Sequence, residues 1–521
     1  MKWSKGSRAQ KKTRSCKSSY KLSTLRKFAG QTAIYGISTV ISRFLNFILT
    51  PIYVGLYPAK VYGIFTTLYS WASILNAVLS FGMETTFFRF LNKYNNQAKV
   101  YSNTFFTVAT VTALFAIFSL SGAHGIAVWM HRESVASLAD YELFIKLFIG
   151  ILCVDSIAVI PFAKLRANGR PMKYGMLKLI NVFCFVGLNL FFLFVVPMVI
   201  SHDWPLASFF QSWFRPAWVG YVFISNFIAS GITLLLLLPE LFQLTLEIDT
   251  RLVKEMFAYS FPVLIANLSF IINENSDKLF LEKLLPGDIS TQQVGIYGAC
   301  CKIAIFLSIF IQAFRLGAEP FFFSYAKNKN SGEVYARIMN YFIIAISLIF
   351  VGLVANIEIL KYFIRGHDAA QRALYWSGLE VVPILLFGYV SLGIYMNLSI
   401  WYKLSDQTKY GLYISGVGAI LTIILNIIFI PLYSYVASAW ISLTAYATMM
   451  ILSYFLGQKN YPIPYDLKKA LLYLASAIII VVLSFKVFNR NLIAGNILLV
   501  IFATATFFKE RKELTTLFRR G

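Results

Sequence analysis

Charged residues within long apolar segments are the part of this sequence best able to bind a substrate. Arg43 and Lys302 lie inside such segments, and Lys278 lies at the end of another. A charge at the centre of a membrane-spanning helix costs about 2.5–3.5 kcal/mol on insertion scales, so such residues usually face a watery cavity or a partner. We therefore predict that these three cations line a cavity. For Arg43 and Lys278, neutralisation within the helix or extension to the membrane surface is the alternative.

Two of these cations occupy equivalent positions in an internal repeat. Displacing the chain by 235 residues, without a gap, aligns Arg43 with Lys278, Pro51 with Pro286, Tyr62 with Tyr297, Gly63 with Gly298, Gly82 with Gly317, and Glu84 with Glu319. The match is clear over the first two apolar segments of each copy and fades afterwards. Duplicated bundles of membrane-spanning helices are usually transporters.

Further charged residues in or beside the apolar segments could form a gate or a site for a coupling ion. They are Glu84, Arg89, Asp155, Glu274, Asp277, Arg315 and Glu319. Spacings of three and four place Glu274 and Asp277 on one broad helix face with Lys278. For the charges at helix ends, structural salt bridges between neighbouring loops are favoured over substrate contact. Asp155 is a lone acid, for which a coupling-ion site and a hydrogen-bonded packing role both stay open.

A run of cations lies around residues 168–171, between two apolar segments. It consists of Lys164, Arg166, Arg170, Lys173 and Lys178. Most such runs only determine topology, because positive charge is retained on the cytoplasmic side of the membrane. The density of Lys164, Arg166 and Arg170 would also attract an anionic headgroup that approaches from the cytoplasm.

The composition requires a polytopic membrane protein. Of the 521 residues, 58% are hydrophobic and only 13% are charged, and the mean hydropathy is +0.67. A helix needs about 20 apolar residues to cross a bilayer. We predict fourteen such helices, over residues 29–53, 61–83, 102–122, 144–164, 176–200, 217–240, 256–276, 294–318, 338–358, 379–402, 410–431, 436–457, 468–487 and 491–508.

An even number of predicted helices separates the two copies of the repeat, so the copies share one orientation. The predicted fold is therefore an all-α integral membrane bundle of two six-helix lobes, related by a parallel pseudo-repeat, with two further helices at the C-terminus. The expected divisions are a basic tail (1–28), an N-lobe (29–240), a linker (241–255), a C-lobe (256–457), and the last two helices with a second basic tail (458–521).

The formal net charge of +24 reflects topology more than a nucleic-acid partner. Ten cations precede residue 29, and the first acid in the chain is Glu84. With the N-terminus inside, 33 Lys and Arg residues fall on the cytoplasmic side and 11 on the other, as the positive-inside rule requires. Both termini are therefore expected in the cytoplasm, with membrane lipids and no nucleic acid as partners.

No cofactor or metal site is expected. The five cysteines lack metal-ligand spacing, and neither a phosphate-binding GxxxxGK[ST] loop nor an HExxH pair occurs. The predicted external loops are too short for a catalytic domain, so the chain is not expected to be an enzyme.

Several stretches resemble the bacterial polysaccharide-biosynthesis (Wzx-type) flippases of the multidrug/oligosaccharidyl-lipid/polysaccharide (MOP) exporter superfamily. They are residues 61–63, 81–90, 162–166, 272–278 and 314–323. The resemblance implies transfer of an undecaprenyl-diphosphate-linked sugar or oligosaccharide across the bacterial inner membrane, for O-antigen, capsule or exopolysaccharide synthesis. It implies that Arg43, Lys278 and Lys302 supply the charge of a cationic cavity, and it leaves other polysaccharide-assembly proteins open as partners.

Three other functions stay open. An ion-coupled exporter of drugs or other small molecules with the same fold would carry a carboxylate-dominated cavity. A membrane polysaccharide polymerase or ligase would need a large external loop with catalytic residues. A noncatalytic scaffold of a synthesis complex is the third.

Overall fold

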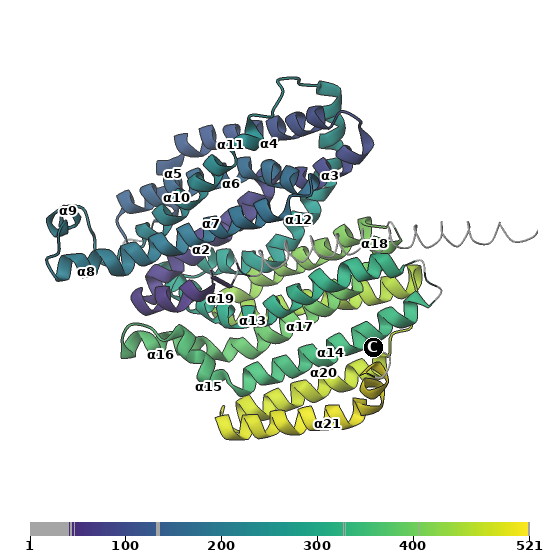
Figure 1. The fold of residues 1–521 in the computed structure, drawn as a ribbon. Coiled ribbons are helices and arrows are strands. Elements are labelled where there is room, and N and C mark those ends of the chain that lie inside the picture. Colours follow the sequence, from purple (N-terminus) through teal and green to yellow (C-terminus); the bar gives the residue numbers. More distant parts are fainter. Residues whose placement is uncertain are drawn as a thin grey trace, which may run out of the picture.

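The computed structural model describes residues 41, 44–45, 47–131, 136–326, 328, 330–405 and 407–518. Nearly all of them are helical, and these ranges contain no β-strand (Figure 1). A bilayer interior offers no water to backbone N–H and C=O groups, and a helix satisfies these groups within one segment. The predicted all-α membrane fold is confirmed.

The first half of the chain forms helices of very unequal length. They are α2 (Ala59–Ser80), α3 (Met83–Lys93), α4 (Gln97–Ser121), α5 (Ala123–Met130), α6 (Leu138–Ala167), α7 (Pro171–Leu190), which runs through a π-helical turn (Phe191–Val195) into α8 (Val196–Ser201), then α9 (Ala207–Gln211), α10 (Gly220–Leu236) and α11 (Leu238–Leu241). A further apolar helix, Phe47–Leu56, precedes α2.

The second half is also built of helices of unequal length, and it ends in a C-terminal pair. Its helices are α12 (Thr250–Leu284), α13 (Gly287–Tyr325), α14 (Ser331–Ala355), α15 (Ile357–Leu360), α16 (Ala369–Ser377), α17 (Val382–Leu398), α18 (Ile400–Leu404), α19 (Lys409–Asn460), α20 (Leu467–Val482) and α21 (Leu492–Phe518). In Figure 1, α20 and α21 lie at the outer edge of this half, and both pack against α14. The predicted lobe boundaries, at 240 and 255, stay a prediction.

Eleven helical segments of the described chain are long and apolar enough to cross a membrane. Two shorter apolar helices, Phe47–Leu56 and α10, lie where the predicted spans 29–53 and 217–240 fall. One of the eleven, α19, covers two predicted spans, 410–431 and 436–457. These helices together lie at all fourteen predicted spans, of which residues 29–40, 42, 43 and 46 fall outside the described part of the chain.

The long helix α19 doubles back on itself at Ser434. This residue has φ 52° and ψ −141°, which are not helical values. In a straight helix Thr422 and Tyr446 would lie about 36 Å apart. Both nevertheless bond to one residue of α12, because the Thr422 hydroxyl donates to Asn273 Oδ1 at 2.8 Å and the Tyr446 hydroxyl donates to the Asn273 carbonyl at 3.3 Å. The two predicted spans therefore pack side by side along α12.

The predicted linker ends in a capping residue for α12. Asp249 Oδ1 accepts hydrogen bonds from the backbone N–H groups of Arg251 and Leu252, and its other oxygen pairs with Lys99 at 2.9 Å. The Lys99 ammonium and these backbone donors hold the pKa of the Asp249 carboxyl below its usual range. A carboxylate at a helix N-terminus satisfies otherwise unpaired donors, so this residue fixes where α12 begins.

Helices α2 and α13, which the internal repeat makes equivalent, pack directly against each other. A Cβ atom on Gly63 would lie 1.9 Å from the Thr291 carbonyl oxygen, and one on Gly295 would lie 2.0 Å from the Ala59 carbonyl oxygen. The two backbones are therefore in contact, which only glycine permits. Beside this contact, Ala59 N–H donates to Gln371 Oε1 of α16 at 3.0 Å.

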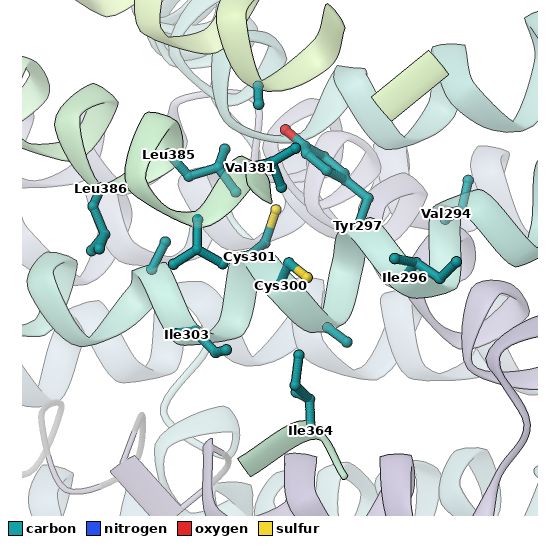
Figure 2. Packing of buried hydrophobic residues seen from close by; sticks show 14 of the residues in the cluster. Val294, Ile296, Tyr297, Cys300, Cys301, Ile303, Ile364, Val381, Leu385 and Leu386 are labelled. Carbon is teal, nitrogen blue, oxygen red and sulfur yellow. The ribbon is translucent and has the colours of Figure 1, made fainter. Parts of the chain in front are cut away.

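The far side of α13 is packed among apolar side chains. Figure 2 shows Tyr297, Cys300, Cys301 and their neighbours on α13 beside Val381 and Leu385, which precede and begin α17. All of these residues are at least nine-tenths buried. The contact between α2 and α13 is therefore backed by a close-packed layer that cannot yield easily.

We predict that Gly295→Ala destabilises the folded protein by about 1–3 kcal/mol, the usual cost of overpacking a well-packed site. The matched control is Gly317→Ala on the same helix, where a Cβ would meet no atom within 4 Å. There, alanine should be neutral or stabilising by up to about 1 kcal/mol through its helix propensity. Thermal unfolding of the purified variants measures both. Equal melting temperatures for the two variants would contradict the close contact.

Candidate functional site

Lys278 is held by an ion pair within its own helix. Its Nζ lies 2.8 Å from Asp277 Oδ1 and donates to the Glu274 carbonyl oxygen at 3.1 Å. The other oxygen of Asp277 accepts a hydrogen bond from the Tyr297 hydroxyl of α13 at 2.6 Å. The Asp277 side chain is only 4% exposed, whereas that of Lys278 is 13% exposed. Lys278 is thus paired within α12 and also lines a cavity.

That cavity, of about 370 Å³, lies between the two halves of the molecule and is hereafter the inner cavity. Helices α12 and α13 contribute Glu274, Lys278 and Lys302, while α2 contributes Tyr69 and Ser70. Within the part of the chain that the structure describes, Lys302 makes no hydrogen bond and no ion pair. Glu274 attracts it electrostatically and Lys278 repels it. Lys302 is thus the cation best placed to bind an anionic ligand.

A larger cavity of about 710 Å³, hereafter the wide cavity, adjoins the first. The two share Ser73, Asn181 and Asn226 as lining residues. The wide cavity is lined by helices α2, α3, α6, α7, α10, α12 and α13, and its charged residues are Glu84, Asp155, Lys178 and Arg315. The structure therefore brings Glu84, Asp155 and Arg315 to one cavity, and Glu274, Lys278 and Lys302 to the neighbouring one.

The net charge of the combined cavity is close to balanced. Lys278 is paired with Asp277, Glu84 is paired with Arg166, and Asp155 and Lys178 attract each other. Opposite charges in a low-dielectric setting offset the cost of desolvating each one. The combined cavity is thus polar without a strong fixed charge, apart from Lys302 in the inner cavity and Arg315 in the wide cavity.

The residues predicted as gate charges engage partners at helix ends. Glu84 of α3 pairs with Arg166 of α6, and Glu319 of α13 pairs with Lys403 of α18 at 2.7 Å. Arg89 lies over the Tyr259 ring, 4.1 Å from its centroid. Each of these contacts joins separate helices at the end of the bundle that is predicted to be cytoplasmic, which agrees with the structural interpretation of these charges. Their role as a gate stays a prediction.

The three residues predicted to attract a headgroup all have contacts within the protein. Lys164 Nζ lies 3.8 Å from the Tyr101 ring centroid, Arg166 pairs with Glu84, and Arg170 lies 3.6 Å from Glu240. Glu240 is only 1% exposed and also binds Lys173 at 2.9 Å. These cations therefore make contacts that join parts of the protein in this conformation. Their attraction of a headgroup stays a prediction.

Arg43, the third predicted cavity cation, lies outside the described residues. Within the described ranges no group of three or more His, Cys, Asp or Glu residues could hold a metal ion.

Sequence reasoning overlooked the amides of the cavity wall. Asn76, Asn181, Asn226 and Asn267 line the wide cavity, as does Lys178, which the sequence analysis treated only as a topology charge. The available signal was the presence of Asn in otherwise apolar segments, which is costly in lipid for the same reason as a charge. Attention to formal charge alone hid that signal.

Comparisons with known proteins agree with the fold. A family model described as "Polysaccharide biosynthesis protein" matches residues 28–325, and the MatE family model matches residues 262–428. No curated protein matches the sequence at a significant level.

Solved structures share the architecture at low sequence identity. The lipid II flippase MurJ, in an inward closed conformation, matches with a TM-score of 0.69 and 12% identity, over 92% of this chain and 99% of its own. A multidrug resistance MATE family transporter of the MOP superfamily, in an inward-facing conformation, gives 0.63 and 12%, over 82% and 97%. A MOP superfamily transporter from Pyrococcus furiosus, described by a binding pocket of reverse polarity, gives 0.53 and 12%, over 83% and 95%. At these identities the likeness establishes the fold.

We predict that Asp277→Asn destabilises the protein by up to about 3–5 kcal/mol, because it leaves Lys278 poorly solvated and without its counter-charge. Adding Lys278→Met to that variant should restore part of the loss. Melting temperatures of the two single variants and the double variant measure this coupling. Glu142→Gln is the control, since its partners Lys146 and His124 are both at least half exposed and such pairs contribute little. A double variant no more stable than Asp277→Asn would contradict the pairing.

Proposed function

Because the chain belongs to the polysaccharide biosynthesis protein family, within the MOP exporter superfamily, we propose that it is a flippase for an undecaprenyl-diphosphate-linked sugar or oligosaccharide. It moves this lipid from the inner to the outer leaflet of the bacterial cytoplasmic membrane, with both of its own termini in the cytoplasm. The substrate serves the synthesis of O-antigen, capsule or exopolysaccharide.

The observation that carries this proposal is the polar cavity between the two halves, with Lys302 as its least paired cation. A diphosphate and a glycan cannot enter hydrocarbon, because each unpaired polar group costs several kcal/mol there. The inner cavity offers Lys278 and Lys302 to the diphosphate. The lipid chain stays between helices in the membrane, where it needs no polar partner.

Movement across the membrane requires that the cavity open to each side in turn. With the N-terminus in the cytoplasm, the contact between α2 and α13 at Gly63 and Gly295 closes the external end. Rocking of the two halves would part these helices and bring together the cytoplasmic ends that carry Glu84 and Arg315. This is alternating access between two repeats around a central site.

The charge of the cavity separates this function from the export of small cationic drugs. Its described lining includes Lys178, Lys278, Lys302 and Arg315 along with the three acids Glu84, Asp155 and Glu274. Carboxylates therefore do not dominate the lining of this cavity. An ion-coupled exporter of cationic drugs would require a lining in which they do.

We predict that Lys302→Ala lowers the rate of flipping by roughly 10- to 100-fold, since a hydrogen bond to a charged group contributes about 1.5–3 kcal/mol. Lys278→Ala should act in the same direction, and Lys302→Arg should keep much of the activity. The measurement is transbilayer movement of a labelled undecaprenyl-diphosphate oligosaccharide in liposomes that contain the purified protein.

Lys146→Ala serves as the control, because Lys146 is half exposed and lies outside both cavities. Flipping that survives Lys302→Ala and Lys278→Ala in folded protein would refute the role of these cations. Wild-type protein that moves no lipid under any imposed ion gradient would refute the flippase proposal itself.

A further inference from the structure

The wall of the wide cavity is built from neutral hydrogen-bonding groups that come mostly from the first half of the chain. Four amides line it: Asn76 of α2, Asn181 of α7, Asn226 of α10 and Asn267 of α12. Hydroxyl groups from the same helices of the first half accompany them, at Ser73, Ser80, Ser230 and Thr233. The cations of the inner cavity come instead from α12 and α13.

Much of this amide capacity is unused within the protein. Asn181 donates to the Thr233 hydroxyl at 2.9 Å, and Asn226 donates to the Tyr69 hydroxyl at 2.8 Å. The oxygens of these two amides accept no hydrogen bond from a described residue. Asn76 and Asn267 make no side-chain hydrogen bond with any residue in the described ranges. All four amides therefore have donors or acceptors left for a ligand.

Amides match the chemistry of sugars better than that of phosphate. An amide side chain both donates and accepts hydrogen bonds, as a sugar hydroxyl does, whereas phosphate oxygens only accept and prefer cationic partners. Of the four charged residues that line this cavity, Asp155 and Lys178 attract each other, and Glu84 is paired with Arg166. Only Arg315, of these four, has no such partner among the described residues. An uncharged ligand is thus favoured over an acidic one.

The aromatic rings of the wide cavity and its size point the same way. Phe162, Tyr174 and Phe270 line it beside the amides, and aromatic rings pack against the apolar faces of pyranoses. Its volume of about 710 Å³ falls in the range of about 300–1,000 Å³ that holds one compact ligand. A short oligosaccharide fits this space, and a long polymer does not.

We propose that the substrate is divided between the two cavities, so that a short, uncharged oligosaccharide binds the amide wall of the wide cavity and the diphosphate binds Lys278 and Lys302 in the inner cavity. This inference rests on the proposed function. It assigns glycan recognition chiefly to the first half of the chain, with Asn267 of α12 added, and recognition of the phosphates to the second half.

Binding by two probes tests this division. One probe is a short-chain isoprenyl diphosphate that carries a neutral trisaccharide, and the other is the same isoprenyl diphosphate without sugar. Wild-type protein should bind the glycosylated probe about tenfold more tightly. The double variant Asn76→Leu with Asn267→Leu should lose that preference and bind the bare diphosphate as before. Lys302→Ala should weaken the binding of both probes by a similar factor.

Asn340→Leu is the matched control, because Asn340 lies on α14 beside a separate apolar pocket, away from both cavities. It should change neither affinity. Thermal unfolding of each variant separates a loss of binding from a loss of fold.

The possible failures are distinct. Equal wild-type affinity for both probes, or an equal loss for both in the asparagine double variant, would overturn the glycan subsite and leave the flippase proposal standing. Tighter binding of a probe with an acidic sugar would overturn its neutral specificity. Failure of wild-type protein to bind either probe would overturn the inference together with the proposed function.

Discussion

The cost of an unsatisfied polar group in hydrocarbon governs every part of this structure. It forces the backbone into helices, and it forces each polar side chain of a span to find a partner or a hydrated cavity. Asp277 shows the rule at one carboxylate, since one of its oxygens pairs with Lys278 and the other accepts a hydrogen bond from Tyr297. Lys302 shows the other solution, because it faces a cavity in place of a bonded partner.

The same rule explains the distribution of charge along the helices. Paired charges such as Glu84 with Arg166 and Glu319 with Lys403 hold helix ends together where water is available. Deeper in the bundle, the polar surface is made chiefly of amides and hydroxyls around the two cavities. Neutral groups are less costly to desolvate than ions, so a cavity can be polar at depth without storing a large electrostatic penalty.

The sequence predicted the fold well and the site in part. Hydropathy reports the need to satisfy the backbone, so the number of spans and the all-α class followed directly from it. The spacing of Glu274, Asp277 and Lys278 placed them on one helix face and offered neutralisation within the helix as the alternative to cavity lining. It could not reveal Tyr297 as the second partner of Asp277, because that contact depends on how two helices pack.

The contacts between segments far apart in the chain were the main feature that the sequence did not predict. Glu84 and Arg166 were assigned to different roles, although they form one ion pair across 82 positions. The amides of the cavity were missed because an isolated Asn in a span does not indicate whether it faces lipid, a neighbour or water. The sequence shows that Gly63 and Gly298 repeat, but it does not show that their helices touch.

The reversal of α19 at Ser434 has a mechanical consequence. Because the turn is made at one residue, no flexible loop connects its two spans. They cannot slide past each other as spans joined by a long loop can. Asn273 of α12 is bonded to both of them. These three spans therefore behave as one stiff body, and Lys278, little more than one turn further along α12, is carried on it. Any displacement of that body therefore moves the Lys278 ammonium with it.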